Sequence, residues 1–194
     1  MSIKGSVTTA DYLPYPDYQR LVKTLMDEKQ YWWVCYCILS FCTGLRFSDV
    51  SRLKWSDVID QRRIIITAKK TNKTHIIPLG SNALDHLNEL YELMGCPPMD
   101  KIILSKADGT AVSIQYINRI LKTWAYRYNL NIENFSTHTF RKTFGRYIYD
   151  KGGGDERTLM YLNRIFKHSS LETTMIYLGI RDEEIKKLFA SIQI

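Results

Sequence analysis

The sequence predicts a mainly α-helical fold with a small antiparallel β-sheet, an α+β arrangement in which helices supply most of the core. Three observations lead to this prediction. Apolar residues recur at helical spacing along most of the chain. Two short β-branched segments flank one polar turn. No repeat or low-complexity linker divides the 194 residues, a length that supports one full core, so we expect a single domain over 1–194.

The first half of the chain is expected to place helices and a β-hairpin around one buried helix. The prolines of LPYPDYQRL lead into a helix near 16–28. The run YWWVCYCILSFCTG predicts a helix over 30–42 that has no polar face and ends at Thr43-Gly44. A short helix restarts in RFSDVSRLKWSDV with Ser48 as its cap. RRIIITAKKTNKTHIIPL then predicts a hairpin whose tip carries three lysines.

The second half is expected to be helical apart from one short strand. Ser81 opens an amphipathic helix that continues to about Met94, and KIILS at 101–105 is expected to form a strand. The remaining predicted helices cover residues 114–128, 137–150, 155–167 and 170–179.

The tail from about 180 to 194 is predicted to be an amphipathic helix. Its apolar residues Ile185, Leu188, Phe189 and Ile192 fall on one face. Such a face needs a partner surface, which can be the chain's own domain or a neighbouring subunit.

Charge and cysteine content limit the class of protein. The chain has 27 Lys and Arg against 20 Asp and Glu, a net charge of +7 and a pI near 9.2, which favours a polyanionic partner, although a merely basic surface explains the charge equally well. Cys35, Cys37 and Cys42 lie in an apolar run and Cys96 is remote, so no zinc or disulfide spacing exists and we expect buried thiols in a reducing compartment. No leader opens the chain, and no apolar run approaches the roughly 20 residues of a membrane span. We expect a cytoplasmic protein without a membrane partner.

Several basic residues lie where predicted elements begin or end. They are Arg46 in TGLRFSD, Lys70 at the hairpin tip, His138 and Arg141 in STHTFRKTF, and His168 in KHSS. Each has an ordinary structural explanation: a helix-start salt bridge with Asp49, a solvated His-Arg pair, a capping histidine. Tyr177, taken alone, is most simply a core aromatic.

Taken together, these residues match what cleavage of a phosphodiester requires. Two guanidiniums can bind the non-bridging oxygens and stabilise the charge of a pentacoordinate transition state. A histidine can accept the proton of an attacking hydroxyl, and a lysine can give one to the leaving oxygen. A tyrosine phenol, with a pKa of about 10, becomes a nucleophile when cations and a base withdraw its proton. Tyr177 is the candidate nucleophile.

The stretches TGLRFSD, HTFR and KHSSLETTMIY, in this order, resemble the signature boxes of the tyrosine recombinase (phage integrase) family. The hairpin with Lys70, eight residues before Pro78, resembles the lysine hairpin of that family. The resemblance spans roughly residues 16 to 180, and the order, spacing and residue types of the boxes together are far more specific than any one box. It implies the catalytic-domain fold of this family, with the hairpin tip reaching towards DNA.

The resemblance also implies a role for each matching residue. Arg46 and Arg141 would clamp the phosphate, and Asp49 would support Arg46. His138 would act as acid and base towards the nucleophile, and His168 would hydrogen-bond the phosphate.

The remaining implied roles concern the two ends of the cleaved bond. Lys70 would protonate the 5′-oxygen leaving group, with Lys69 and Lys73 as alternatives in the same hairpin. Tyr177 would form a 3′-phosphotyrosyl link. This link keeps the energy of the phosphodiester, so neither a nucleotide cofactor nor a metal is expected.

The implied partner is double-stranded DNA. A basic face is expected to contact it through Lys69, Lys73, Lys142, Arg146, Arg164 and Lys167. The resemblance further implies a homo-oligomer, a tetramer on DNA joined through the C-terminal tail, with DNA-bending accessory proteins as possible partners. The expected location is the bacterial cytoplasm, at the nucleoid when bound to DNA.

The sequence departs from the family pattern at four places. Lys167 stands where a glycine usually precedes the second histidine, Asp49 replaces a more common glutamate, and GGGDERT is a loose version of the usual loop. An N-terminal helical domain that closes around DNA does not fit in 194 residues, so we expect it to be absent, in either a fragment or a naturally short member.

Two other functions remain as alternatives. A type IB topoisomerase shares the chemistry but acts as a monomer with little site preference. A non-catalytic DNA-binding module on the same fold would be expected to lose Tyr177, Arg46 or Arg141, and all three are present. A basic helical interaction domain with accidental motifs would require several independent coincidences of spacing.

Overall fold

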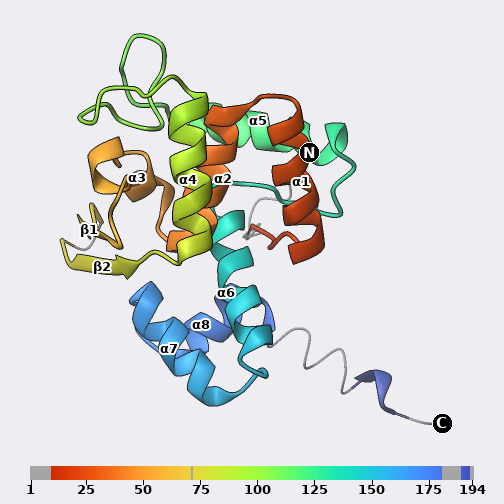
Figure 1. Ribbon diagram of the computed structural model, residues 1–194. Coiled ribbons are helices and arrows are strands. Elements are labelled where there is room, and N and C mark those ends of the chain that lie inside the picture. The colour runs from red at the N-terminus through yellow and green to blue at the C-terminus, as the bar shows by residue number, and fades with distance from the viewer. Residues whose placement is uncertain (1–9, 71, 181–188, 193–194) are drawn as a thin grey trace.

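In the computed structural model, helices surround one central helix, and a two-stranded hairpin lies at the edge of the molecule (Figure 1). The structure describes residues 10–70, 72–180 and 189–192. Its helices are α1 (Tyr15–Asp27), α2 (Tyr31–Thr43), α3 (Phe47–Val50), the 3-10 helix η1 (Trp55–Asp57), α4 (Ser81–Leu93), α5 (Ile114–Arg127), α6 (Thr139–Lys151), α7 (Glu156–Phe166) and α8 (Leu171–Leu178), and its strands are β1 (Arg63–Thr67) and β2 (Thr74–Pro78). The predicted fold class is therefore confirmed.

Helix α2 is the centre of the main core. Nine of its residues are buried, and α1, α3, α4 and α6 pack against it. This agrees with the prediction of a buried helix from a run without a polar face. The helix ends at Gly44, which adopts φ +58° and so takes the left-handed conformation that favours glycine.

Two local predictions are wrong. Ser48 does not cap the short helix, because Arg46 is the N-cap residue of α3 and Ser48 lies inside the helix. KIILS forms no continuous strand: Ile102 bridges to Lys54 and Ser105 bridges to Ala111, with a turn between them. Ile103 and Leu104 of this segment are buried in the core, but the two bridges do not extend into a continuous strand.

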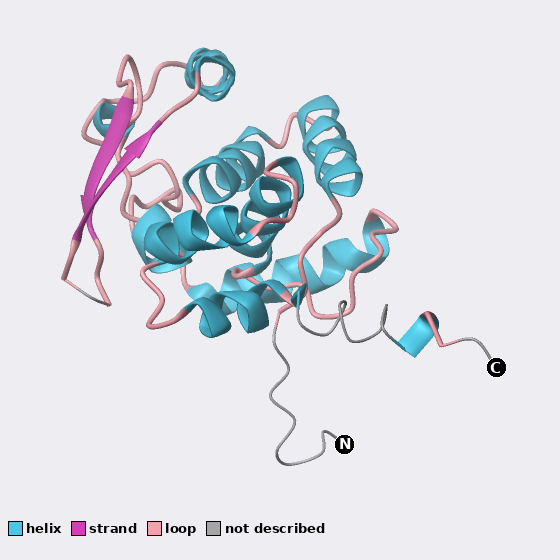
Figure 2. Ribbon diagram, turned by 90° about the horizontal axis from the view of Figure 1, so that it is seen from below, coloured by secondary structure: helices cyan, strands magenta, loops and turns pink. Residues whose placement is uncertain are grey.

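The hairpin forms as predicted, with a register that gives it one buried face. Ile64 pairs with Ile77, and Ile66 pairs with His75. Ile64 and His75 are buried, whereas Ile65 and Ile76, on the other face, are exposed. Figure 2 shows the two strands side by side at one edge of the helical body. A two-stranded sheet is marginally stable alone, so the position of the hairpin depends on contacts with the helices.

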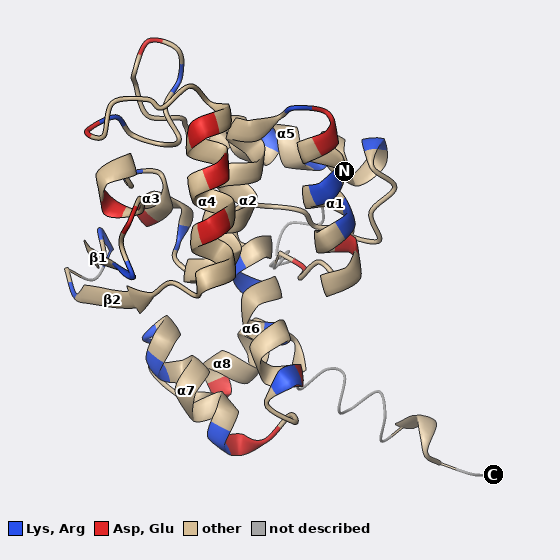
Figure 3. Cartoon of the chain, in the orientation of Figure 1, with Lys and Arg blue, Asp and Glu red and all other residues tan. Residues whose placement is uncertain are grey.

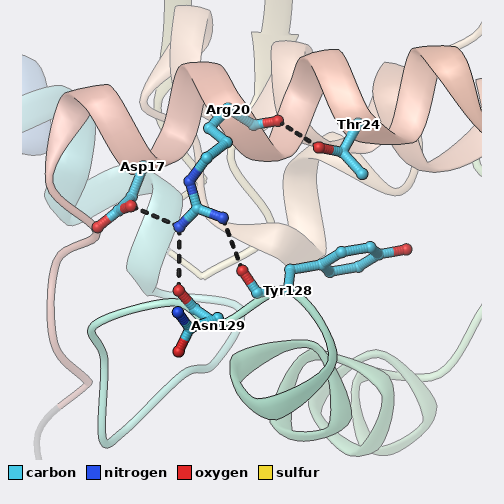
Figure 4. Close-up of polar contacts among 5 residues, drawn as sticks. All are labelled: Asp17, Arg20, Thr24, Tyr128 and Asn129. Atoms are coloured by element: carbon cyan, nitrogen blue, oxygen red, sulfur yellow. Dashed lines mark hydrogen bonds and ion pairs between the residues drawn. The ribbon is translucent and has the colours of Figure 1, made fainter.

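A polar clamp fixes the N-terminal helix on the end of α5 (Figure 4). Arg20 donates from Nη1 to the carbonyl of Tyr128 at 2.7 Å and from Nη2 to the carbonyl of Asn129 at 3.0 Å. Asp17 holds the same guanidinium at 2.7 Å. These carbonyls follow the last turn of α5, where helical partners are missing, so Arg20 caps α5 from another helix.

Helix α6 joins the main core to a second apolar cluster. It packs on α2 and also on α7 and α8. The buried members of the second cluster are Leu159, Leu162, Phe166, Leu178 and Ile180. Gly145 lies where α6 meets this cluster: a Cβ there would come within 2.5 Å of Leu178 Cδ2 and 2.9 Å of Phe166 Cζ. The absence of a side chain at Gly145 thus sets how closely α8 packs on α6.

Gly145→Ala is expected to destabilise the protein by about 1–2 kcal/mol, although alanine favours a helix over glycine by about 1 kcal/mol. The reason is overpacking, because Leu178 and Phe166 are 1% and 0% exposed and would have to shift within a packed core. Chemical denaturation measures the change. Gly80→Ala is the matched control, since a Cβ at Gly80 meets nothing within 4 Å. Equal stability of the two variants would contradict the close packing of α8.

Several predictions concern the surface and the tail. Residues 181–188, which include Ile185 and Leu188, lie outside the described part, and Phe189 and Ile192 are 71% and 63% exposed. Cys35 and Cys37 are buried as expected, whereas Cys96 is exposed. Within the described ranges, no helix has the length and apolar character needed to span a membrane.

Candidate active site

Arg141 is a buried cation that holds three elements together. It lies in the first turn of α6 and is 3% exposed. Its Nη1 donates to the carbonyl of Gly44, at the end of α2, and its Nη2 donates to the carbonyl of Phe166 at 3.1 Å, at the end of α7. The guanidinium also lies over the Phe166 ring, 4.3 Å from its centroid. Burial lowers the pKa of Arg141 to about 10, which keeps it charged at neutral pH.

Gly44 is required at its position for two reasons. Its φ of +58° favours glycine, and a Cβ there would come within 2.7 Å of the Phe144 ring. Its carbonyl therefore approaches Arg141 in a conformation that other residues adopt only with strain. The TGLR sequence thus positions both guanidiniums: Gly44 holds Arg141, and Arg46 follows two residues later.

Arg46 is the second cation of the site. It is half-buried and precedes α3 in extended conformation. Its charge lowers the pKa of His138, His168 and Arg141, which places it near all three. The structure therefore brings the two predicted clamp arginines to one place.

Tyr177 extends from α8 to the same place. Its hydroxyl oxygen is buried and has no hydrogen-bond partner among the described residues. Its ring makes edge contacts with Phe166 at 5.4 Å and His168 at 5.1 Å between centroids. Burial raises the pKa of Tyr177, while the nearby charges of Arg141 and Arg46 act to lower it. Burial is the larger effect, so the pKa of Tyr177 stays above its ordinary value, and the phenol keeps its proton until a base withdraws it.

His168 lies between Tyr177 and the end of α7. Its Nδ1 is 3.1 Å from the Thr174 hydroxyl of α8. Burial, and then the charges of Arg141 and Arg46, lower the pKa of His168 to about 4. The imidazole is therefore neutral at pH 7, and Thr174 fixes its orientation.

His138 is the N-cap residue of α6 and is exposed at the surface. Desolvation by its neighbours, followed by the charges of Arg141 and Arg46, lowers the pKa of His138. Lys142 and Lys70 contribute to the same shift, which places the hairpin lysine close to His138. A neutral imidazole at physiological pH can accept a proton.

Asp49 has other partners than the sequence indicated. We expected it to support the Arg46 guanidinium, but its Oδ1 instead accepts from Arg52 Nη2 at 3.1 Å and from the backbone N–H of Lys69 at 2.8 Å. Arg52 also donates to the carbonyl of Thr67 at 2.7 Å. Asp49, which is 1% exposed, therefore anchors the hairpin next to Lys70.

The predicted DNA-contact residues divide into two groups. Lys69, Lys73 and Arg164 are exposed, and Lys70 is exposed beside them. Lys142 and Arg146 are only 6% and 9% exposed, which does not fit their expected place on an open basic face. In Figure 3, basic segments mark the hairpin, α6 and the end of α7 nearest the hairpin. Lys167 is half-buried, and its Nζ donates to the carbonyl of Thr74 at 2.9 Å.

Two residues of the site, His75 and Thr174, were missed from the sequence, and a third, Lys142, was expected to contact DNA but lies beside Tyr177. His75 of β2 is buried with an unpaired Nε2, and burial and the charge of Lys167 lower its pKa. Lys142 Nζ lies 5.1 Å from the centroid of the Tyr177 ring, so it contacts the candidate nucleophile. Thr174 orients His168. His75 could have been identified from the sequence, because the alternation of the hairpin places it on the inward face of β2. No local sequence pattern indicates the positions of Lys142 and Thr174.

The arrangement can bind and polarise a phosphate. Arg141, Arg46 and His168 lie around the buried phenol, and His138, with Lys70 near it, lies close to the charges of the same two arginines; these are the types of group required for nucleophilic attack on phosphorus. Among the described residues, no group of three or more His, Cys, Asp or Glu side chains is arranged to hold a metal ion.

Curated proteins similar to this chain are tyrosine recombinases. "Tyrosine recombinase XerD" of Staphylococcus epidermidis is 26% identical over 156 residues, covering 78% of this chain and 51% of that protein. A "Probable integrase/recombinase" of Acholeplasma phage L2 is 30% identical over 136 residues, covering 70% of this chain and 44% of that protein. The chain thus spans about half the length of the curated relatives it matches.

Solved structures share the fold. XerA recombinase superposes with a TM-score of 0.70 at 18% identity, covering 100% of this chain and 68% of that one. XerH site-specific recombinase, in a post-cleavage complex with palindromic difH substrate, gives a TM-score of 0.71 at 16% identity and covers 98% of this chain and 55% of that one. The model of the phage integrase family matches residues 12–184. The chain therefore belongs to the phage integrase family.

Proposed function

We propose that the protein is a site-specific DNA recombinase that cleaves and rejoins DNA through a 3′-phosphotyrosine intermediate on Tyr177. The observation that carries this proposal is the buried Tyr177 hydroxyl beside Arg141 and Arg46. The relatives, which are named as recombinases and integrases, support it. The XerH structure, which shares this fold, is described as a post-cleavage complex with palindromic difH substrate and so supports the proposal.

The two arginines would bind the scissile phosphate. Arg141 uses its Nη atoms on Gly44 and Phe166, which fixes the plane of the guanidinium before DNA arrives. A preorganised cation stabilises developing charge without a cost of reorganisation during the reaction. Arg46, which is half-buried and follows Gly44 by two residues, would supply the second charge.

The phosphate would also receive a hydrogen bond from His168. The Thr174 hydroxyl has one proton, and its distance to Nδ1 is 3.1 Å against 3.4 Å to the carbonyl of Ser170. If the Thr174 hydroxyl donates to Nδ1, the shorter contact, the proton of the neutral ring is on Nε2. Nε2–H is then a donor for a phosphate oxygen.

The chemical step would be a transesterification, in which the phosphoryl group passes from O5′ to Tyr177. Tyr177 Oη attacks phosphorus and its proton passes to the neutral His138, while the bond from phosphorus to O5′ breaks and Lys70 gives a proton to O5′. The products are a 3′-phosphotyrosyl protein and a 5′-hydroxyl. Reversal of the same step by another 5′-hydroxyl rejoins the DNA, so the energy of the bond is retained.

Exposed cations would bind the DNA backbone around this centre. Lys69, Lys73 and Arg164 are the candidates that reach solvent. We propose double-stranded DNA as the partner, assembly as a homo-tetramer on it through the C-terminal tail, accessory bending proteins, and a place in the bacterial cytoplasm at the nucleoid.

The test is detection of the covalent intermediate. The purified protein is mixed with supercoiled DNA that carries the sequence flanking its own gene, stopped with detergent and digested with protease and nuclease. Mass spectrometry is expected to find a nucleotide on the peptide containing Tyr177. An adduct on another residue would refute the assignment. DNA binding that weakens with salt, without any adduct on this or on a nicked strand-trapping substrate, would favour a non-catalytic binding module.

A further inference from the structure

Lys167 occupies a backbone conformation that is unfavourable for lysine. It ends α7 with φ +54° and ψ +45°, in the left-handed region, immediately before His168. Glycine takes this conformation without strain, and a side chain there has a cost. A lysine at this turn therefore calls for a compensating contact.

The compensating contact reaches the lysine hairpin. Lys167 Nζ donates to the backbone carbonyl of Thr74 at 2.9 Å, across 93 residues of sequence. Thr74 is the first residue of β2 and directly follows the tip that carries Lys70. The bond thus joins the turn next to His168 to the hairpin with the candidate general acid.

The tip of the hairpin is held from two sides. On one side the Asp49 carboxylate accepts from the backbone N–H of Lys69 at 2.8 Å. On the other side Lys167 holds the carbonyl of Thr74. Lys70 lies between these two points and is itself exposed, so the anchors rather than its own packing determine where its ammonium lies.

The buried face of β2 shows that this contact lies within the site. His75, next to Thr74, is 9% exposed and lies near the charges of Lys167, Arg141 and Arg46. Lys167 therefore connects the hairpin to the group of residues around the phosphate clamp, and not to a remote surface.

We propose that Lys167 is a positioning residue, which fixes Lys70 against the leaving group by tying the hairpin to the turn that carries His168. This inference rests on the proposed function, in which Lys70 gives a proton to O5′ as the bond from phosphorus to O5′ breaks. It assigns to Lys167 a contact within the protein where the sequence suggested a contact with DNA.

The experiment compares two leaving groups at the cleavage site mapped for the wild type. Lys167→Met keeps the length of the side chain without a donor, Lys167→Gly removes the tether and relieves the backbone, and Lys167→Arg keeps a donor. Each is tested on ordinary DNA and on DNA with sulfur in place of the bridging O5′, since sulfur leaves without a proton. Arg164→Met is the matched control, because it removes an exposed cation three residues earlier on α7.

Lys167→Met and Lys167→Gly are expected to cleave ordinary DNA about 10- to 100-fold more slowly and to recover most of the loss on the sulfur substrate. Lys70→Ala should show the same pattern, and Lys167→Arg should lie close to the wild type. Lys167→Gly is expected to unfold at the same or a higher temperature than the wild type, so its loss of activity cannot be ascribed to loss of stability. Arg164→Met should slow both substrates equally through weaker DNA binding. Equal slowing of both substrates by Lys167→Met would overturn the proposal.

Hydrogen exchange in the free protein tests the tether without any cleavage. The amides of residues 68–70 and 72–75, on either side of the hairpin tip, are expected to exchange faster in Lys167→Met and Lys167→Gly than in the wild type, with no change in Arg164→Met. Unchanged exchange in Lys167→Met would overturn the proposal. If the wild type forms no adduct, the proposed function fails, and the exchange rates still decide whether Lys167 holds the hairpin.

Discussion

Tyr177→Phe is expected to abolish the covalent link to DNA while leaving the protein as stable as the wild type or about 1 kcal/mol more stable. The chemical loss follows because phenylalanine has no oxygen to attack phosphorus. Stability should not fall, because the buried Tyr177 hydroxyl makes no hydrogen bond of good geometry among the described residues, although the Arg141 guanidinium lies within its reach.

Two measurements check this expectation. Adduct formation is followed on denaturing gels with a nicked, strand-trapping DNA, and the free energy of unfolding is obtained from urea denaturation. Tyr126→Phe serves as the control, because Tyr126 is 93% exposed and outside the site. DNA affinity at fixed salt should be the same for all three proteins. An adduct formed by Tyr177→Phe would exclude Tyr177 as the nucleophile.

The parts of the site that the sequence predicts are those fixed by local chemistry. The TGLR stretch ends a helix at Gly44 and places an arginine, Arg46, two residues later. KKTNKT, between two β-branched runs, forms a turn whatever lies elsewhere in the chain. Ser170 caps α8 by accepting from the N–H of Thr173. These features follow from interactions between residues close in sequence.

The parts that were missed depend on contacts between distant segments. Arg141 binds carbonyls 97 and 25 residues away, and no sequence pattern indicates which carbonyls lack partners. Asp49 is three residues from both Arg46 and Arg52, so spacing alone cannot choose between them; the carbonyl of Thr67 draws Arg52 to the carboxylate. Lys142 was assigned to DNA because it is a lysine, and only the packing of α8 on α6 shows that it faces the Tyr177 ring.

Arg141→Lys is expected to reduce cleavage by about 100- to 1,000-fold, although it keeps the formal charge. The guanidinium donates to Gly44 and Phe166 with separate nitrogens and stacks on the Phe166 ring. A lysine ammonium is a single point donor and cannot reproduce this planar arrangement. The bidentate contact with the phosphate would be lost as well.

The same substitution should also lower stability. A lysine ammonium at this position can hydrogen-bond only one of the two carbonyls, Gly44 or Phe166. The other carbonyl would be left buried without a partner, at a cost of about 1–3 kcal/mol. Burial lowers the pKa of Arg141 to about 10 from a reference value of 12.5, and lysine begins from a lower reference value of 10.5. The buried ammonium would therefore be partly neutral at mildly alkaline pH, and the activity of Arg141→Lys should fall at a lower pH than that of the wild type.

The rate of adduct formation between pH 6 and pH 9, together with urea denaturation, separates these effects. Arg157→Lys, an exposed position on α7, is the charge-preserving control and should match the wild type in both measurements. Activity of Arg141→Lys within a few-fold of the wild type would show that a single positive charge is sufficient. We would then abandon the proposal that a planar guanidinium is required. The proposal that the Gly44 and Phe166 carbonyls preorganise the phosphate clamp would fail with it.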